Sequence, residues 1–164
     1  MNTSRTSEAT TKRNPVTVER TSEREVVVTR MFDAPARLVF EAWTKPELFR
    51  QWWLPQSMGM ALHSLEMDAQ TGGSYRLDFG EGVVFFGTYL EVTPHSRIVW
   101  TNDEGGQDGS VTTVTFEDRD GGTLLTMTEV YPSKEALDEA GTGAADATHE
   151  TFAQLDDLLA QLGR

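Results

Sequence analysis

Cysteine is absent from the chain, and its absence excludes several kinds of chemistry. Without a thiol the protein has no disulfide framework, no thiolate nucleophile and no zinc site built on thiolates. The three histidines, His63, His95 and His149, occur singly and without the spacing of metal ligands, so the sequence predicts no metal site and no cofactor. A Gly-x-Ser-x-Gly motif is also missing. The sequence thus offers no catalytic constellation, which favours a non-enzymatic function and leaves the question of an activity open.

Basic residues and long apolar runs are scarce as well. The formal net charge is −12, which argues against nucleic acids and anionic membrane surfaces as partners. No apolar run reaches the roughly 18 residues that a membrane-spanning helix needs. The start of the chain is rich in serine and threonine and lacks the apolar segment of a secretory signal. We expect residues 1–14 to be a disordered tail, residues 15–164 to form one domain, and the protein to be a cytoplasmic monomer or weak dimer.

The pattern that follows begins with one strand and two short helices. Residues 24–32 are rich in β-branched side chains and predict a strand that ends before Pro35. Apolar residues between Leu38 and Trp43 recur at helical spacing, with Pro35 suited to the first turn. Pro46 interrupts this helix and starts a second short one. The sequence therefore predicts a helix–kink–helix unit after the first strand.

A series of strands and a long helix complete the pattern. Six strand-like segments, joined by short turns, predict an antiparallel meander: 61–69, 74–80, 83–93, 97–102, 110–118 and 123–131. From about residue 144, Phe152, Leu155 and Leu159 share one face of a helix of roughly 18–20 residues. Only the concave face of a curved sheet offers enough apolar surface to bury that face. The order of elements predicts an α+β fold in which a seven-stranded antiparallel sheet holds the last helix.

The first helical unit also carries a resemblance to a known family. The segment 29–55 resembles the opening of the START-like, helix-grip (SRPBCC) superfamily, and within it the AHSA-like family, named after an activator of the 90-kDa heat-shock protein ATPase. The likeness runs from about residue 24 to the carboxyl end. The matching positions are Arg30, Phe32, Asp33, Ala34, Pro35, Val39, Phe40, Ala42, Trp43, Thr44, Pro46, Trp52, Trp53 and Pro55. Gln70, where the family commonly has arginine, and residues 150–152, where it commonly has Gly-Trp, depart from the pattern.

The resemblance implies a helix-grip fold with an internal cavity, and the residues indicate what lines it. Trp43 and Trp52 fit core positions, whereas Trp53 must point elsewhere and is a candidate for the mouth of a pocket. Arg30 and Glu129 alternate with inward-facing apolar residues, so each is either a structural partner within the core or a group that recognises an oxygen-rich ligand. The remaining candidates are apolar or aromatic: Tyr75, Leu77, Phe79, Phe86, Trp100, Phe116, Met127 and Phe152.

A lining of this kind is typical of pockets for small hydrophobic or aromatic molecules. The sequence therefore predicts binding of such a molecule between the sheet and the last helix. Two alternatives stay open. One is a chaperone accessory that acts through an external surface, and the other is an enzyme resembling polyketide cyclases or hydrolases, in which Arg30 and Glu129 orient a carbonyl substrate. A cavity too small for a ligand would favour the first alternative, and a roomy cavity with paired polar groups would favour the second.

Overall fold

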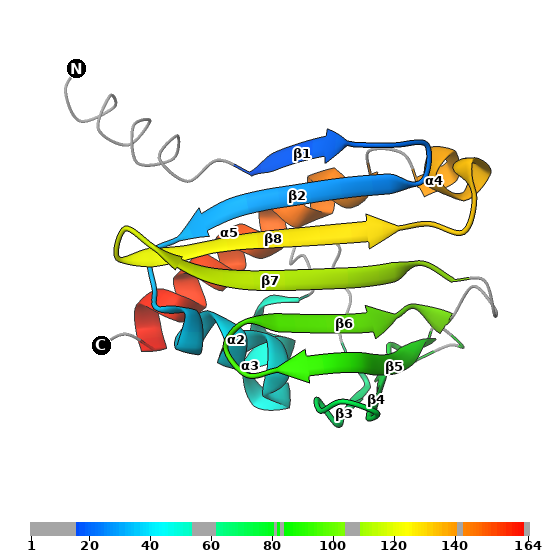
Figure 1. Cartoon of the computed structure of the whole chain (residues 1–164). Helices are drawn as coiled ribbons and strands as arrows, with labels where there is room; N and C mark the ends of the chain where they lie inside the picture. Colours follow the sequence, from blue (N-terminus) through cyan, green and yellow to red (C-terminus); the bar gives the residue numbers. More distant parts are fainter. Residues whose placement is uncertain are drawn as a thin grey trace, which may run out of the picture.

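The computed structural model describes residues 16–53, 62–80, 82, 84–103, 109–140 and 143–162, without the side chains of 139–149. The tail expected over residues 1–14 lies outside this part of the chain. Figure 1 shows an antiparallel sheet with helices on one side. The elements, in chain order, are β1 (Thr17–Arg20), β2 (Glu25–Phe32), α2 (Ala36–Thr44), α3 (Pro46–Trp52), β3 (Ser64–Met67), β4 (Ser74–Asp78), β5 (Val84–Thr93), β6 (Arg97–Thr101), β7 (Val111–Arg119), β8 (Gly122–Val130), α4 (Lys134–Ala140) and α5 (Gly143–Leu162).

The described strands form one eight-stranded sheet in the order β1-β2-β8-β7-β6-β5-β4-β3. From β3 to β8 each strand pairs with the next one in the chain, as the short turns predict. The sheet is completed by β2, which pairs with β8 so that Val28 lies opposite Met127. The predicted α+β meander is confirmed, and the strand count is eight instead of seven.

The additional strand is β1, at one edge of the sheet. It pairs with β2, placing Val18 opposite Val28, and all of its residues are exposed. A strand without a buried face lacks the alternation of apolar and polar residues on which the sequence prediction depends. An ion pair between Arg20 and Asp138, at 2.9 Å, also connects β1 to α4. Because both partners are well exposed, this pair adds little to the stability of the fold.

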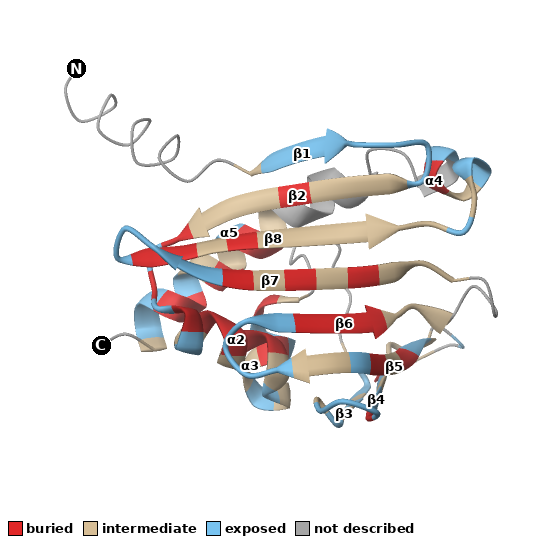
Figure 2. Cartoon of the chain, viewed as in Figure 1, coloured by how far each residue is buried: buried red, intermediate tan, exposed pale blue. Residues whose placement is uncertain are grey.

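Helix α5 covers the apolar face of the sheet, as its stripe of large side chains predicts. Phe152, Leu155 and Leu159 are buried, and so is Leu158. Figure 2 shows buried residues concentrated in the middle of β6 and β7 and in α2. Phe152 contacts Phe32 of β2 edge to face, with ring centroids 5.4 Å apart. We call the group formed by Phe152 of α5 and the strand residues Phe32, Phe116 and Leu125, all buried in one hydrophobic cluster, the helix-side core.

The two short helices fill the space beside α5. Pro46 occupies the first turn of α3, and the indole N–H of Trp52 donates a hydrogen bond to the Ala42 carbonyl across the kink, at 2.9 Å. Pro35 lies at the N-cap of α2 and not inside its first turn. A carboxylate oxygen of Asp118 on β7 accepts the Ala36 N–H at 3.1 Å, so a strand provides the cap of this helix. None of the helices described is long and apolar enough to cross a membrane.

Candidate functional site

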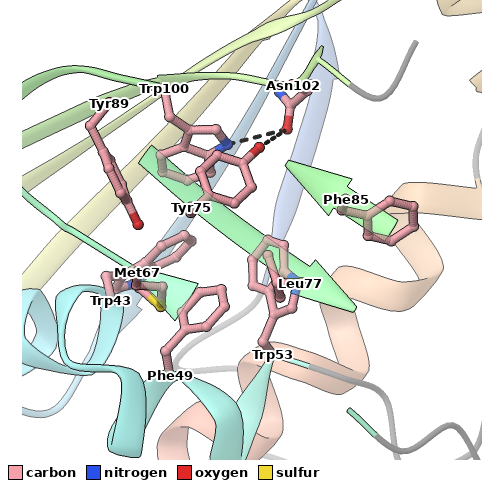
Figure 3. A pocket seen from close by; sticks show the side chains of 10 residues that line it. All are labelled: Trp43, Phe49, Trp53, Met67, Tyr75, Leu77, Phe85, Tyr89, Trp100 and Asn102. Atoms are coloured by element: carbon pink, nitrogen blue, oxygen red, sulfur yellow. Dashed lines mark hydrogen bonds between the residues drawn. The ribbon is translucent and has the colours of Figure 1, made fainter. Parts of the chain in front are cut away.

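A cavity of about 200 Å³ lies between the two short helices and the β3–β6 end of the sheet. Figure 3 shows its lining side chains, most of them aromatic, arranged around a common space. We call it the edge cavity because β3 and β4 end the sheet on this side. It is lined by Trp43, Phe49, Trp53, Met67, Tyr75, Leu77, Phe85, Tyr89, Trp100 and Asn102.

Strand alternation supplies the sheet wall of the edge cavity. Tyr75 and Leu77 are two residues apart on β4 and therefore share a face. Their partners on β5 are Gly87 and Phe85. A Cβ atom on Gly87 would lie 1.9 Å from the Thr101 carbonyl oxygen and 2.8 Å from a ring carbon of Tyr75. Glycine at this position is therefore what allows the Tyr75 ring to lie against the sheet.

Packed aromatic rings form the helix wall. The Trp43 ring lies 4.7 Å from that of Trp52, and Trp53 stacks on Phe49 with centroids 4.8 Å apart. Trp43 and Trp52 are 2% and 0% exposed, which confirms the prediction that both are core residues. Trp53 is half-buried and lines the cavity. Of these three neighbouring tryptophans, Trp52 packs in the core and Trp53 lines the cavity, while Trp43 does both.

Asn102 closes one end of the cavity through a set of hydrogen bonds. Its side-chain oxygen accepts the Trp100 indole N–H at 3.3 Å and lies 3.2 Å from the Tyr75 hydroxyl, which is also 2.8 Å from the Thr101 carbonyl. Its amide NH₂ donates to the hydroxyls of Ser110 and Thr112, each at 3.0 Å. These bonds fix the orientation of the amide and leave it engaged with the protein. Sequence reasoning missed Asn102, because a single polar residue after a strand does not differ from an ordinary turn residue.

The hydroxyls of Tyr89 and Tyr75 point in different directions (Figure 3). Figure 3 shows the Tyr89 hydroxyl pointing toward Trp43 and Met67, across the cavity, whereas the Tyr75 hydroxyl points to Asn102. Tyr89 is 5% exposed, and within the described part of the chain its hydroxyl has no hydrogen-bond partner. Burial raises the pKa of the Tyr89 phenol well above its ordinary value, and the negative charge of Asp68 raises it further. The group is therefore a neutral hydroxyl with a proton to donate.

The structure brings some of the predicted site residues to this cavity and leaves others elsewhere. Trp53, Tyr75, Leu77 and Trp100 line it. Phe79 lies beside it and packs edge to face on Phe85, at 5.3 Å. The helix-side core contains Phe116 and Phe152, and Met127 packs half-buried against buried core residues. The edge cavity thus lies apart from the predicted location between the sheet and α5, which stays a prediction because the side chains of 143–149 in α5 lie outside the described part of the chain.

Phe86 lies on the opposite face of β5. It is 43% exposed and lines an open hollow of about 750 Å³ together with Glu66, Asp68 and Asp103. Its neighbour Phe85 has the cavity-lining position instead. The two residues are adjacent and chemically identical, so the sequence does not indicate which one faces inward. The pairing of β5 with β4 decides it.

Arg30 and Glu129 both point inward, but neither lines the edge cavity. The Arg30 guanidinium donates to the Phe152 carbonyl at 3.0 Å and to the Asp156 carboxylate, and it lies over the Phe32 ring. Burial raises the pKa of the Asp156 carboxyl, while the bond from Arg30 opposes that rise. Arg30 therefore ties β2 to α5, which corresponds to the structural interpretation of this residue.

Glu129 accepts hydrogen bonds from two hydroxyls. These come from Thr112, at 3.0 Å, and Tyr131, at 2.8 Å. Burial, followed by the charge of Glu129 and its hydrogen bond, raises the pKa of the Tyr131 phenol well above its ordinary value. Glu129 lies opposite Val26 on β2, four positions along the strand from Arg30. The two residues are therefore not brought together to orient one substrate. Among the described residues, no group of three or more possible metal ligands is found.

Known proteins resemble this chain in sequence family and in fold. The structure of a protein from Rhodobacter sphaeroides superposes with a TM-score of 0.80 at 24% identity, over 90% of this chain and 99% of the other. A protein from Mycobacterium smegmatis gives 0.74 at 23% identity, over 90% and 99%. The solution structure of a Staphylococcus epidermidis protein gives 0.68 at 27% identity, over 88% and 94%. A search of curated proteins found no match.

A family model covers most of the domain. The model described as "Activator of Hsp90 ATPase homolog 1-like protein" matches residues 33–160, a range that includes α2, α3, β3 to β8 and most of α5. The matched range contains every residue that lines the edge cavity. The resemblance seen in the segment 29–55 is thereby confirmed, and the chain belongs to the Activator of Hsp90 ATPase homolog 1-like family, within the START-like superfamily.

Proposed function

We propose that the protein binds a small, largely apolar aromatic molecule in the edge cavity. The observation that carries this proposal is a cavity of about 200 Å³ with a mostly aromatic lining. The polar groups of Tyr75, Tyr89 and Asn102 lie on the wall that the sheet forms. Ligand pockets commonly combine an apolar lining with a small number of oriented polar groups. The family and the fold support ligand binding in general terms. The position and the volume of the edge cavity support a location and a size for this ligand.

The volume limits the size of the ligand. An engineered apolar cavity of about 150 Å³ is known to bind benzene. A space of about 200 Å³ therefore accommodates one aromatic ring with a short substituent. The walls are aromatic side chains whose rings pack on one another, such as Phe49 on Trp53, and they favour a flat ligand.

An enzymatic function receives less support from the residues described. Arg30 and Glu129, the groups that the enzyme alternative needs, are each engaged with protein partners outside the cavity. Among the described residues, the side chains that line the cavity include no carboxylate, histidine or amine. The proposal is therefore one of binding, in which the molecule is held and not converted.

A small fluorinated aromatic, 4-fluorotoluene, tests the proposal. We expect its ¹⁹F signal to show saturable binding to the full chain. Leu77→Phe should weaken this binding at least about tenfold, because it fills a space that Leu77 borders at 3% exposure. Leu90→Ala, an exposed change on the outer face of β5, serves as the matched control and should leave binding unchanged. Absence of saturable binding, or equal binding by the Leu77→Phe variant, would refute the proposal. If the binding is saturable and Leu77→Phe weakens it, native mass spectrometry of the protein from its own host should identify the physiological ligand.

A chaperone-accessory function is the second candidate, and one observation favours it besides the family's description. Phe86 and Leu90 project from the outer face of β5 with 43% and 51% exposure. Exposed large apolar side chains on one strand face are common in protein–protein contacts. Stimulation of the ATPase of the host's 90-kDa heat-shock chaperone, lost in a Phe86→Ser/Leu90→Ser variant and kept in Leu77→Phe, would support this function. No stimulation by the unaltered protein would exclude it.

A further inference from the structure

We infer that the ligand of the edge cavity is an uncharged aromatic molecule with a hydrogen-bond acceptor, such as a ketone or ester carbonyl, which accepts the hydroxyl proton of Tyr89. This inference rests on the proposed function, since it specifies the chemistry of a ligand in the same cavity. It follows from which polar groups of the wall are already engaged and which are not.

The polar groups at the Asn102 end are engaged within the protein. Asn102 accepts from Trp100 and donates to Ser110 and Thr112. The Tyr75 hydroxyl lies within hydrogen-bond distance of the Thr101 carbonyl and the Asn102 side chain. A hydroxyl has one proton, so Tyr75 already has a choice of acceptors. A ligand gains little at this end, because each new bond would replace an existing one.

Donors without acceptors are found elsewhere in the wall. The Tyr89 hydroxyl points across the cavity, and within the described part of the chain it has no hydrogen-bond partner (Figure 3). The indole N–H of Trp43, a lining residue, is buried and also lacks an acceptor among the residues described. The Trp43 Nε1 atom is covered by protein atoms, so the Tyr89 hydroxyl is the donor that a ligand in the cavity can reach. A ligand that brings an acceptor complements this hydroxyl.

The charges around the cavity favour an uncharged ligand. No Asp, Glu, Lys or Arg is among the described lining residues. An anion would lose its hydration without meeting a cation, and both Asp68 near Tyr89 and the net charge of −12 would repel it. A quaternary ammonium would meet aromatic faces, which attract cations. A quaternary ammonium would still leave the Tyr89 proton without an acceptor. A neutral molecule with a hydrogen-bond acceptor therefore complements the cavity better.

Two nearly isosteric probes isolate the hydrogen bond. Acetophenone carries a carbonyl where α-methylstyrene carries a methylene group, and both have one ring with a short substituent. We expect Tyr89→Phe to weaken acetophenone binding about tenfold, the loss typical of one hydrogen bond, and to change α-methylstyrene binding by less than about twofold. Because the variant removes a hydroxyl without a protein partner, it should fold with unchanged or slightly higher stability.

Tyr75→Phe is the matched control on the same wall. Its hydroxyl is engaged by Thr101 and Asn102, so its loss should affect both probes to the same extent through the shape of the cavity. Benzoate and phenyltrimethylammonium complete the set, and we expect each to bind at least about tenfold more weakly than acetophenone.

The possible outcomes separate this inference from the proposed function. Binding of both neutral probes that Leu77→Phe weakens but Tyr89→Phe does not would overturn the inference and leave the binding function intact. Preferred binding of benzoate or of the quaternary ammonium would overturn it in the same way. If neither neutral probe binds the unaltered chain, both the inference and the proposed function fail. A Tyr89→Phe effect on acetophenone alone supports the inference.

Discussion

The helix-side core and the edge cavity are both aromatic, yet the side chains of the first are buried in one hydrophobic cluster, whereas those of the second surround a cavity. In the helix-side core, Phe32, Phe116 and Phe152 are buried together with Leu125, and the Phe32 and Phe152 rings are in contact. At the edge, a comparable density of aromatic side chains surrounds a space of about 200 Å³. Aromatic composition alone therefore does not determine whether a region of this fold is solid or hollow.

The difference lies in the elements that face each region. Helix α5 is 20 residues long and places Phe152, Leu155 and Leu159 on the sheet in one continuous row. The described elements that face the edge cavity are the short helices α2 and α3, whose lining side chains approach β4 and β5 from one end. One long amphipathic helix thus places a continuous row of apolar side chains on the sheet, whereas the side chains of two short helices surround a cavity.

Gly87→Ala should have the largest effect of the substitutions proposed here, because it disrupts the edge cavity and leaves the helix-side core unchanged. The added Cβ would lie 1.9 Å from the Thr101 carbonyl oxygen, and backbone cannot move aside as easily as a side chain. We expect the free energy of unfolding, measured by urea denaturation, to fall by about 3 kcal/mol or more, together with loss of probe binding.

Leu90→Ala on the same strand is the control for this change. Leu90 is exposed, so the free energy of unfolding should change by less than about 0.5 kcal/mol. A Gly87→Ala variant with unaltered stability and unaltered binding of 4-fluorotoluene would show that the Tyr75 wall tolerates a methyl group, contrary to the close approach described above.

Enlarging one side chain in each region tests the difference between solid and hollow directly. Phe152→Trp adds volume to the helix-side core, where Phe152 is 2% exposed, and should lower the free energy of unfolding by about 1–3 kcal/mol through overpacking. Leu77→Phe adds volume beside the edge cavity and should lower it by less than about 1 kcal/mol. Equal losses for the two variants, measured by denaturant unfolding, would mean that both regions are packed to the same density.

Alkaline pH should destabilise the protein through two of its three tyrosines, Tyr89 and Tyr131. Burial raises the pKa of both phenols above the ordinary value near 10, with added contributions from Asp68 and Glu129 respectively. A group whose folded pKa is raised contributes stability that is fully present below the unfolded pKa and is lost as the pH rises toward the folded pKa. Between pH 10 and the folded value, the free energy of unfolding should therefore fall by about 1.4 kcal/mol per pH unit for Tyr89. Tyr131 is about half exposed, so solvent screening limits its contribution to a narrower pH range.

Single substitutions show how much of the pH dependence of stability comes from Tyr89 at the edge cavity and how much from Tyr131. Tyr89→Phe, at the edge cavity, should remove the larger part of this fall in stability, and Tyr131→Phe, at the end of β8, the smaller part. Absorbance near 295 nm should show these two phenols ionising as the chain unfolds. Ionisation of all three tyrosines near pH 10 in the folded protein would contradict the expected shifts.

The smallest expected difference concerns the two faces of β5. Phe85→Ala removes a lining side chain that packs on Phe79, whereas Phe86→Ala removes one from the outer face. Both residues are more than 40% exposed, so each substitution should lower the free energy of unfolding by only about 0.5–1 kcal/mol. Binding of 4-fluorotoluene should weaken with Phe85→Ala alone. Weaker binding with Phe86→Ala would mean that the two residues have exchanged faces.

The sequence predicts the architecture well because its patterns are regular. The helical spacing around Trp43, the alternation in the strands and the apolar row at Phe152, Leu155 and Leu159 each specify one buried face. β1 was missed because an exposed edge strand has no such face. The helix-grip fold, apart from this strand, thus follows from patterns that are local in the chain.

The site is less accessible to sequence reasoning because it depends on contacts between distant segments. Phe85 and Phe86 differ only through the pairing of β5 with β4, and the position of the cavity depends on how α2 and α3 meet the sheet. The role of Asn102 follows from its bonds to Trp100 and Thr112, which no spacing in the chain indicates. Arg30 was placed on the inward face from the sequence, and the structure supplies its partner, Asp156.

The pairing of β2 with β8 has a consequence for how the chain folds. Strands β3 to β8 are connected as successive hairpins, so their contacts close short loops, whereas the pairing of Val28 with Met127 joins segments far apart in the chain. Closing a long loop costs more conformational entropy and slows the step in which it occurs. We therefore expect the hairpins around the cavity to form early and β2 to join late, with α5 then covering the apolar face. Pulse-labelled hydrogen exchange during refolding should protect the amides of β6 and β7 before those of β2, and the reverse order would contradict this route.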